Sequence, residues 1–275
     1  MKNLVISAML LCAVPAVAHD MWVEPQSYTV SAGQAAAISL RVGHADDEDA
    51  WRAPWERVHS FRSYDPSNVV QDQQAALVVG PADGVPNAIV ALKSVGTHIV
   101  ALESYHSTSK LEAVKFNDYA KTEGLDNVIA LRAQTGKSDT PGIELYSRRA
   151  KALVQVGATP SDNVLKPIGQ TLEIVPLRNP YANDKATAVP VRLLFQGKPL
   201  AGAQIRLLPL SSKIVAPRVL RTDSEGRATF DVPRRGRWLI MAVHARPMVG
   251  NPNADFDTIF ASLTFGYGPR EDVAR

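Results

Sequence analysis

The sequence has almost no cysteine: its 275 residues contain one, Cys12, close to the N-terminus. The residues before it, Met9-Leu10-Leu11, lack the small residue that a lipoprotein cleavage site needs ahead of its cysteine, so we expect no lipid anchor. If Cys12 is removed with a signal peptide, the remaining chain has no thiol. Disulfides, thiolate metal sites and cysteine nucleophiles are then excluded, and any bound metal must be held by nitrogen and oxygen atoms.

Long apolar runs and a strong net charge are also missing. Beyond the N-terminus, no stretch approaches the roughly eighteen apolar residues of a membrane helix, so we expect no membrane insertion after signal cleavage. Lys and Arg total 30 against 27 Asp and Glu, which gives a formal net charge of +3, or 3 − 1 = +2 without Lys2. A charge this small and this evenly spread argues against a nucleic-acid partner.

The common catalytic and metal-binding motifs are absent as well. The sequence contains no H-E-x-x-H or H-x-x-x-H pattern, no G-x-S-x-G turn, no phosphate-binding loop and no G-x-G-x-x-G. We therefore predict that the protein is not an enzyme.

The N-terminus has the pattern of a secretory signal peptide. Residues 1–18 combine a positive start at Lys2, an apolar stretch over 4–14 and an A-x-A cleavage site at 16–18, which predicts export to the periplasm. Cleavage after residue 18 makes His19 the first residue. Its imidazole and its free α-amine, whose pKa is about 7.7–8.0, can together chelate a metal ion near neutral pH.

The rest of the sequence predicts a mainly β fold. Short apolar runs separated by Gly, Pro, Asn and Asp recur about every ten residues, which is typical of two antiparallel β-sandwich domains of immunoglobulin-like or transthyretin-like type. We expect strands at 28–30, 36–42, 75–79, 88–93, 98–104, 152–157, 171–176, 191–195, 204–208, 228–232, 238–244 and 260–265.

One helix and one domain boundary interrupt these strands. Residues 110–123 carry Leu111, Phe116 and Tyr119 at helical spacing, and Gly124 follows as a stop, which predicts a single short helix in the first domain. A polar stretch with prolines over 157–169 predicts a boundary. We therefore expect an N-terminal domain over 19–160 and a C-terminal domain over 161–275.

Histidines are the candidate metal ligands, and three besides His19 lie where strands end. His44 follows Gly43 and precedes an acidic run at 46–49, His106 follows Tyr105, and His244 ends the strand that Trp238 begins. Side chains at strand ends face clefts more often than those in strand centres. His244 fits a position in the hydrophobic core about as well as it fits a role as a metal ligand. For the acidic run at 46–49, a solvated loop is the simpler interpretation.

The two remaining histidines are weaker candidates. His98 alternates with Val100 and Leu102, which favours a core or half-buried position. His59 lies in a predicted loop or short helix, where we expect it to be exposed.

Taken together, these segments resemble a family of secreted bacterial proteins described as an uncharacterised domain of nickel-uptake-associated periplasmic proteins (DUF4198-like). The resemblance rests on His19-Asp20-Met21-Trp22 with Glu24-Pro25, Gly43-His44, 116–119 with 123–125, 146–148 with 150–152, 172–177 with 179–180, 197–203, Asp223 with Gly226, and 236–238 leading to His244. The turns at 197–203, 222–228 and 233–238 also resemble those of transthyretin-like and carboxypeptidase-regulatory-type sandwiches.

The family resemblance implies a periplasmic metal-binding or metal-delivery protein that supports nickel or cobalt uptake by a membrane metal transporter. The positions that match best are His19, His44 and His244, with His106 a weaker match. Nitrogen ligands suit nickel, cobalt, copper and zinc, and intrinsic affinity by itself favours copper. Two alternatives stay open: a non-catalytic β-sandwich module that binds a protein or a glycan, and a copper enzyme with a histidine brace at His19.

Overall fold

The computed structural model describes residues 20–44, 47–52, 54–82, 84–182, 186–210 and 216–267. Strands dominate these residues, and two α-helices accompany them, which confirms the mainly β class. Residues 1–18 and His19 lie outside the described residues, so the signal peptide stays a prediction. None of the described helices is long and apolar enough to cross a membrane.

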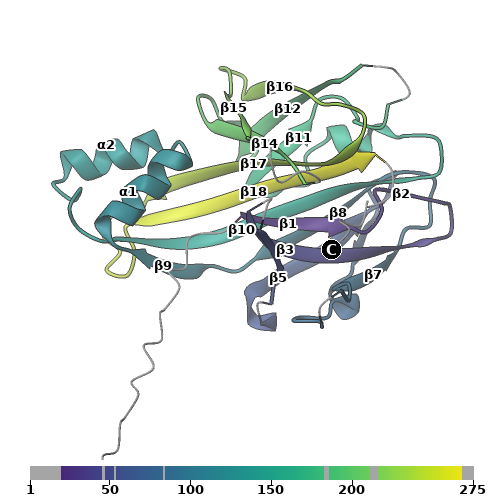
Figure 1. Ribbon diagram of the computed structural model, residues 1–275, viewed down its shortest axis with the longest axis horizontal. Coiled ribbons are helices and arrows are strands. Elements are labelled where there is room, and N and C mark those ends of the chain that lie inside the picture. The colour runs from purple at the N-terminus through teal and green to yellow at the C-terminus, as the bar shows by residue number, and fades with distance from the viewer. Residues whose placement is uncertain are drawn as a thin grey trace, which may run out of the picture.

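A ten-stranded sheet forms the middle layer of the molecule, and we call it the central sheet (Figure 1). Its strand order is β15-β14-β17-β18-β10-β8-β5-β6, with β2 and β9 also paired to β10. The strands are β2 (Thr29–Val30), β5 (Val58–Tyr64), β6 (Val70–Asp72), β8 (Gly96–Ser104), β9 (Ser107–Leu111), β10 (Gly142–Val156), β14 (Gln204–Pro209), β15 (Arg218–Arg221), β17 (Gly236–Pro247) and β18 (Phe256–Tyr267).

Two smaller sheets cover opposite faces of the central sheet. The N-terminal sheet contains β1 (Asp20–Pro25), β3 (Ala35–His44), β4 (Asp47–Ala50) and β7 (Ala88–Ala91). The C-terminal sheet contains β11 (Leu172–Pro176), β12 (Ala188–Phe195), β13 (Lys198–Pro199) and β16 (Arg227–Asp231). Short 3-10 turns at η1 (Trp55–Arg57), η2 (Gln74–Ala76) and η3 (Asp162–Leu165) connect strands.

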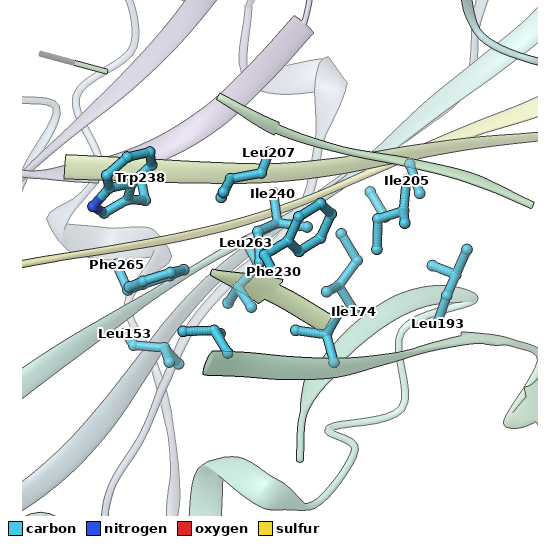
Figure 2. Packing of buried hydrophobic residues seen from close by; sticks show 14 of the residues in the cluster. Leu153, Ile174, Leu193, Ile205, Leu207, Phe230, Trp238, Ile240, Leu263 and Phe265 are labelled. Atoms are coloured by element: carbon cyan, nitrogen blue, oxygen red, sulfur yellow. The ribbon is translucent and has the colours of Figure 1, made fainter. Parts of the chain in front are cut away.

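The C-terminal sheet packs on the face of the central sheet that we call the C-face. Figure 2 shows Ile174 and Phe230 of the C-terminal sheet pointing toward Ile205, Ile240 and Leu263 of the central sheet. All five side chains are at most 2% exposed. Because side chains alternate along a strand, the residues of β17 that face this core are every second residue, Trp238, Ile240, Ala242 and His244.

The opposite face, which we call the N-face, has a different cover at each end. Residues of the N-terminal sheet pack on β8 and β10 in one core, which includes Val23, Leu40, Val100 and Val154. The buried Trp22 packs on N-face residues of β14 and β17, namely Leu208, Leu239 and Met241. Helices α1 (Ala113–Thr122) and α2 (Asp126–Gln134) cover the other end of this face (Figure 1).

The helical region contains two helices where the sequence predicted one. Gly124 separates them with a φ of +67°, as expected for a helix stop. A Cβ at Gly124 would lie 2.6 Å from the Gln204 side chain, so the turn also needs glycine for space. The second helix was missed because its apolar residues, such as Val128, Ile129 and Leu131, do not form a single stripe.

The central sheet joins the two predicted domains. Strand β10 lies before the predicted boundary at 157–169 and β18 after it, yet they pair in parallel from Glu144↔Phe256 to Ala152↔Thr264. The units predicted at 19–160 and 161–275 thus share one continuous sheet. The expectation of purely antiparallel sheets needs correction for this pair and for β2 with β10.

Several predicted elements differ locally from the structure. Residues 75–79 form no strand, and the turn η2 occupies their start. The loop or short helix expected around His59 is present only as the 3-10 turn η1, and His59 itself lies in strand β5. Strand β1 was missed because it contains Asp20 and Glu24, although all its residues are buried. Glu24 is tolerated there because Arg41 and Arg237 pair with it.

Candidate functional site

The start of β1 and the end of β3 lie at the same end of a strand pair. The two strands are antiparallel, with Asp20 opposite Gly43. His44 ends β3, and its backbone pairs with Asp47 of β4. His19 itself lies outside the described residues, but it is bonded to Asp20. The described backbone therefore brings the attachment point of His19 next to His44. These two histidines are among the four predicted metal ligands.

Asp20 belongs to a buried group of polar and charged side chains that we call the acidic cluster: Asp20, Tyr119, Glu123, Glu144 and Arg206. Nη2 of Arg206 in β14 lies 3.2 Å from Oδ1 of Asp20 and 2.8 Å from Oε2 of Glu123 at the end of α1. The Tyr119 hydroxyl donates a 3.3 Å hydrogen bond to Oε2 of Glu144 in β10. The cluster thus occupies the N-face where α1, β1 and the central sheet meet.

Burial determines the protonation of this cluster. It raises the pKa of Glu123 to about 7, although Arg206 opposes the shift, and the charges of Asp20 and Glu144 raise it further. Burial likewise raises the pKa of Glu144 to about 7, against hydrogen bonds from Thr258 and Tyr119. Two carboxyl groups are therefore close to their titration point at neutral pH. An added cation would favour their ionised form.

His244 lies on the other side of the central sheet. It is a half-buried C-face residue of β17, and its ring centroid is 4.5 Å from that of Phe195. Burial, followed by the nearby charge of Arg246, lowers the pKa of His244, so the ring is neutral at neutral pH. A neutral imidazole can bind a metal, but the sheet separates this one from β1 and β3.

His106 takes part in a second group on the C-face side. Its Nε2 atom lies 3.1 Å from Oδ1 of Asp257, and Nε of Arg246 donates a 2.9 Å hydrogen bond to Oδ2 of the same carboxylate. Asp257 pairs with Arg246 across β17 and β18, two residues along from His244. The structure therefore places His106 and His244 on the C-face side, whereas β3, which ends at His44, belongs to the sheet that covers the N-face.

The remaining histidines have structural surroundings. His98 is 2% exposed, and its Nε2 atom lies 2.7 Å from the carbonyl oxygen of Ser94, as expected for a core histidine. His59 is exposed and lies edge-on to Tyr105 at 4.9 Å, in agreement with the predicted surface position. Within the described ranges, no three His, Asp or Glu side chains come together as a metal site.

Sequence reasoning missed the acidic cluster except for its neighbour His19. Glu123, Glu144 and Arg206 come from three separate segments, and no local spacing relates them. The available signal was β1 itself, an apolar segment with an acidic residue at its start. Only the packing of α1 onto the N-face brings the carboxylates together.

Comparison with known families identifies the chain. The profile of a family described as "Domain of unknown function (DUF4198)" matches residues 16–246, so the protein belongs to this family. The predicted membership of the DUF4198 family is confirmed, whereas its association with nickel uptake stays a prediction. No curated protein matches the chain.

Solved structures show only distant similarity. A two fibronectin type-III domain segment of chicken tenascin is 11% identical, with 88% of this chain and 96% of that chain covered and a TM-score of 0.21. Salmonella alpha-2-macroglobulin reacted with methylamine is 10% identical, with coverages of 90% and 15% and a TM-score of 0.26. The D0-D1 domain of intimin is 13% identical, with coverages of 90% and 97% and a TM-score of 0.20.

Proposed function

We propose that the chain, cleaved after residue 18, is a non-catalytic periplasmic protein that binds a divalent transition metal and supports nickel or cobalt uptake by a membrane transporter. The ion is held by the α-amine and imidazole of His19 together with His44. His106 and His244, on the far side of the central sheet, form no part of this site.

The observation that carries this proposal is the position of Asp20. Its carboxylate is 4% exposed and shares one guanidinium, that of Arg206, with Glu123, while Glu144 adds further negative charge to the same cluster. Asp20 and Glu123 share this one arginine, and a nearby cation would favour the ionised forms of Glu123 and Glu144, whose pKa values are about 7. The residue bonded to Asp20 is His19, which would offer two nitrogen donors there.

The donors available around this position fit a divalent transition metal. Amine and imidazole nitrogens suit nickel, cobalt, copper and zinc, and carboxylate oxygens can complete such a set. The described residues do not form a metal site without His19. The proposal therefore depends on a free His19 amine, which a chain with an extra N-terminal residue would lack.

Calorimetric titration tests the proposal. The chain beginning at His19 is titrated with Ni(II), Co(II), Cu(II) and Zn(II), and so is the same chain with one alanine added ahead of His19. We expect the extension and the H44A substitution each to weaken binding by tenfold or more. Equal affinity with and without the added alanine, or a Kd no tighter than about 1 mM (about 4 kcal/mol of binding free energy), contradicts the proposal.

His59 provides a matched control for the histidine substitutions. Its ring is exposed and contacts Tyr105 on the central sheet, away from the acidic cluster. H59A should therefore leave the affinity unchanged, while H44A lowers it. If H59A and H44A weaken binding equally, the ion binds surface histidines without a defined site.

A second candidate function is a binding module for another protein. The edge strand β15 favours it, because all four of its residues are exposed and Val219 and Leu220 present apolar side chains. Exposed edge strands can pair with a strand of a partner. Under this alternative, chelators and added metals leave the melting temperature unchanged, since only a ligand that binds the folded state stabilises it.

A further inference from the structure

A cavity lies between the end of α2 and the hairpin that joins β17 to β18. Phe256 in its wall pairs with Glu144 of the acidic cluster across β10 and β18. Its volume is about 300 Å³, which is the lower end of the range for small-molecule sites. Leu131, Met248, Val249 and Phe256 provide apolar walls, and Arg132 and Lys137 bring positive charge. Asp255 also lines the cavity and pairs with Lys137, so the walls combine apolar surface with two cationic side chains and one carboxylate.

Arg132 is held firmly beside this cavity. It is 1% exposed, and its Nε donates a 3.1 Å hydrogen bond to Oδ1 of Asn117. Its Nη2 donates a 2.5 Å hydrogen bond to the carbonyl oxygen of Thr140, and the guanidinium lies 4.7 Å from the ring centroid of Phe116. The third nitrogen, Nη1, is buried and has no hydrogen-bond partner among the residues that the structure describes.

The charge of Arg132 is also not neutralised by an ion pair. The nearest relevant carboxylate, Asp255, is engaged by Nζ of Lys137 at 2.8 Å and by the backbone N–H of Ile143 at 3.1 Å. No carboxylate in the described ranges lies within 4.0 Å of the Arg132 guanidinium. The charge of Asp255 acts on Arg132 only from beyond ion-pair distance, so a bound anion in direct contact would compensate the buried guanidinium better.

We propose that this cavity binds a small organic acid with a short apolar tail. Its carboxylate pairs with the Arg132 guanidinium, which has a free Nη1 donor, and with the charge of Lys137. Its tail packs on Leu131, Val249 and Phe256. Neither the metal proposal nor the acidic cluster is involved, so the two proposals stand or fall separately.

The test uses hexanoate as the probe, with hexanamide as its neutral counterpart and inorganic phosphate as an anion without a tail. The chain beginning at His19 is titrated with each compound at pH 7. We expect hexanoate to bind at least tenfold more tightly than either of the other two. In two-dimensional NMR, the amides of Lys137, Val249 and Gly250 should shift, while that of Phe230 in the opposite core should not. Equal binding of hexanoate and hexanamide, or shifts away from the hairpin, overturns the proposal.

Substitutions locate the binding groups. R132M should abolish binding of hexanoate, and K137M should weaken it about threefold, because Lys137 is half exposed and contributes a screened charge. K121M, on the exposed side of α1, serves as the matched lysine control and should bind as the parent does. Should R132M fail to fold, K137M and the NMR shifts decide. If K137M and K121M bind hexanoate with equal affinity, the proposal that this cavity binds a small organic acid is overturned.

Discussion

The buried ion pair between Lys151 and Glu173 connects the central sheet to the C-terminal sheet, and its loss has a predictable cost. Both side chains are 1% exposed, and Nζ lies 2.6 Å from Oε1 of Glu173. The same carboxylate accepts backbone N–H bonds from Ile168, Gly169 and Gln170 at 2.8, 3.0 and 3.2 Å. Glu173 therefore also anchors the end of the segment that the sequence predicts as a domain boundary.

The two single substitutions should differ in magnitude. E173Q leaves the Lys151 ammonium buried without a counter-charge and weakens three backbone hydrogen bonds, so we expect a loss of about 4–5 kcal/mol in the free energy of unfolding. K151M removes the cation but leaves the carboxylate its three N–H donors, so the loss should be about 2–3 kcal/mol. The double variant should be about 1–2 kcal/mol more stable than the sum of the single losses predicts, because the partners interact directly.

Urea unfolding followed by tryptophan fluorescence measures these losses at pH 7. D126N provides the control, since Asp126 pairs with Arg221 at a similar distance of 2.8 Å but with side chains 71% and 45% exposed. Its effect should stay within about 1 kcal/mol. A loss below about 1 kcal/mol for E173Q, or strict additivity in the double variant, would refute the reasoning.

Two further predictions concern the helical region. The pKa values of Glu123 and Glu144 are raised from 4.5 to about 7, so the stability they contribute is complete below pH 4.5 and is lost as the pH rises through 7. Urea unfolding between pH 5 and 8 should show that the free energy of unfolding decreases by about 2–3 kcal/mol for each carboxyl group. In the E123Q/E144Q variant the free energy of unfolding should hardly change over that range. If it hardly changes in the parent protein either, the two carboxyl groups are not buried as described. G124A should cost about 2–3 kcal/mol, because it adds contact with the Gln204 side chain to the strain of a positive φ, whereas G136A, with φ +66° and open space around it, should cost about 1 kcal/mol. Equal melting temperatures for these two variants would show that the close approach to Gln204 has no effect.

The mainly β class was predictable because it depends on local signals. Alternating apolar residues and turn residues are adjacent in the sequence, and most expected strands appear within a few residues of their predicted bounds. The errors occur where tertiary contacts override these signals. Strand β1 contains two acidic residues that only partners from β3, β14 and β17 make tolerable.

The candidate site was likewise predictable only in its local features. The sequence could show that four histidines lie at the N-terminus or at strand ends, but no local pattern states which of them share a face. That depends on strand parity and on the order of strands in the central sheet. His244 alternates with Ile240 and Ala242, while Trp22, two residues along β1 from Asp20, packs on Leu239 and Met241. Side chains of neighbouring residues in β17 thus point to opposite faces of the central sheet, so a shift of one residue decides on which face a side chain lies.

The sequence by itself determined the β class, the family, the lack of any thiol ligand beyond Cys12 and the candidate histidines, because each of these depends on composition or on neighbouring residues. Only the tertiary structure decided that the two predicted domains share a sheet through β10 and β18. It alone also brought Asp20, Glu123 and Glu144 into one buried cluster. These outcomes depend on which distant segments pack together, since burial and electrostatic coupling arise from contacts in space.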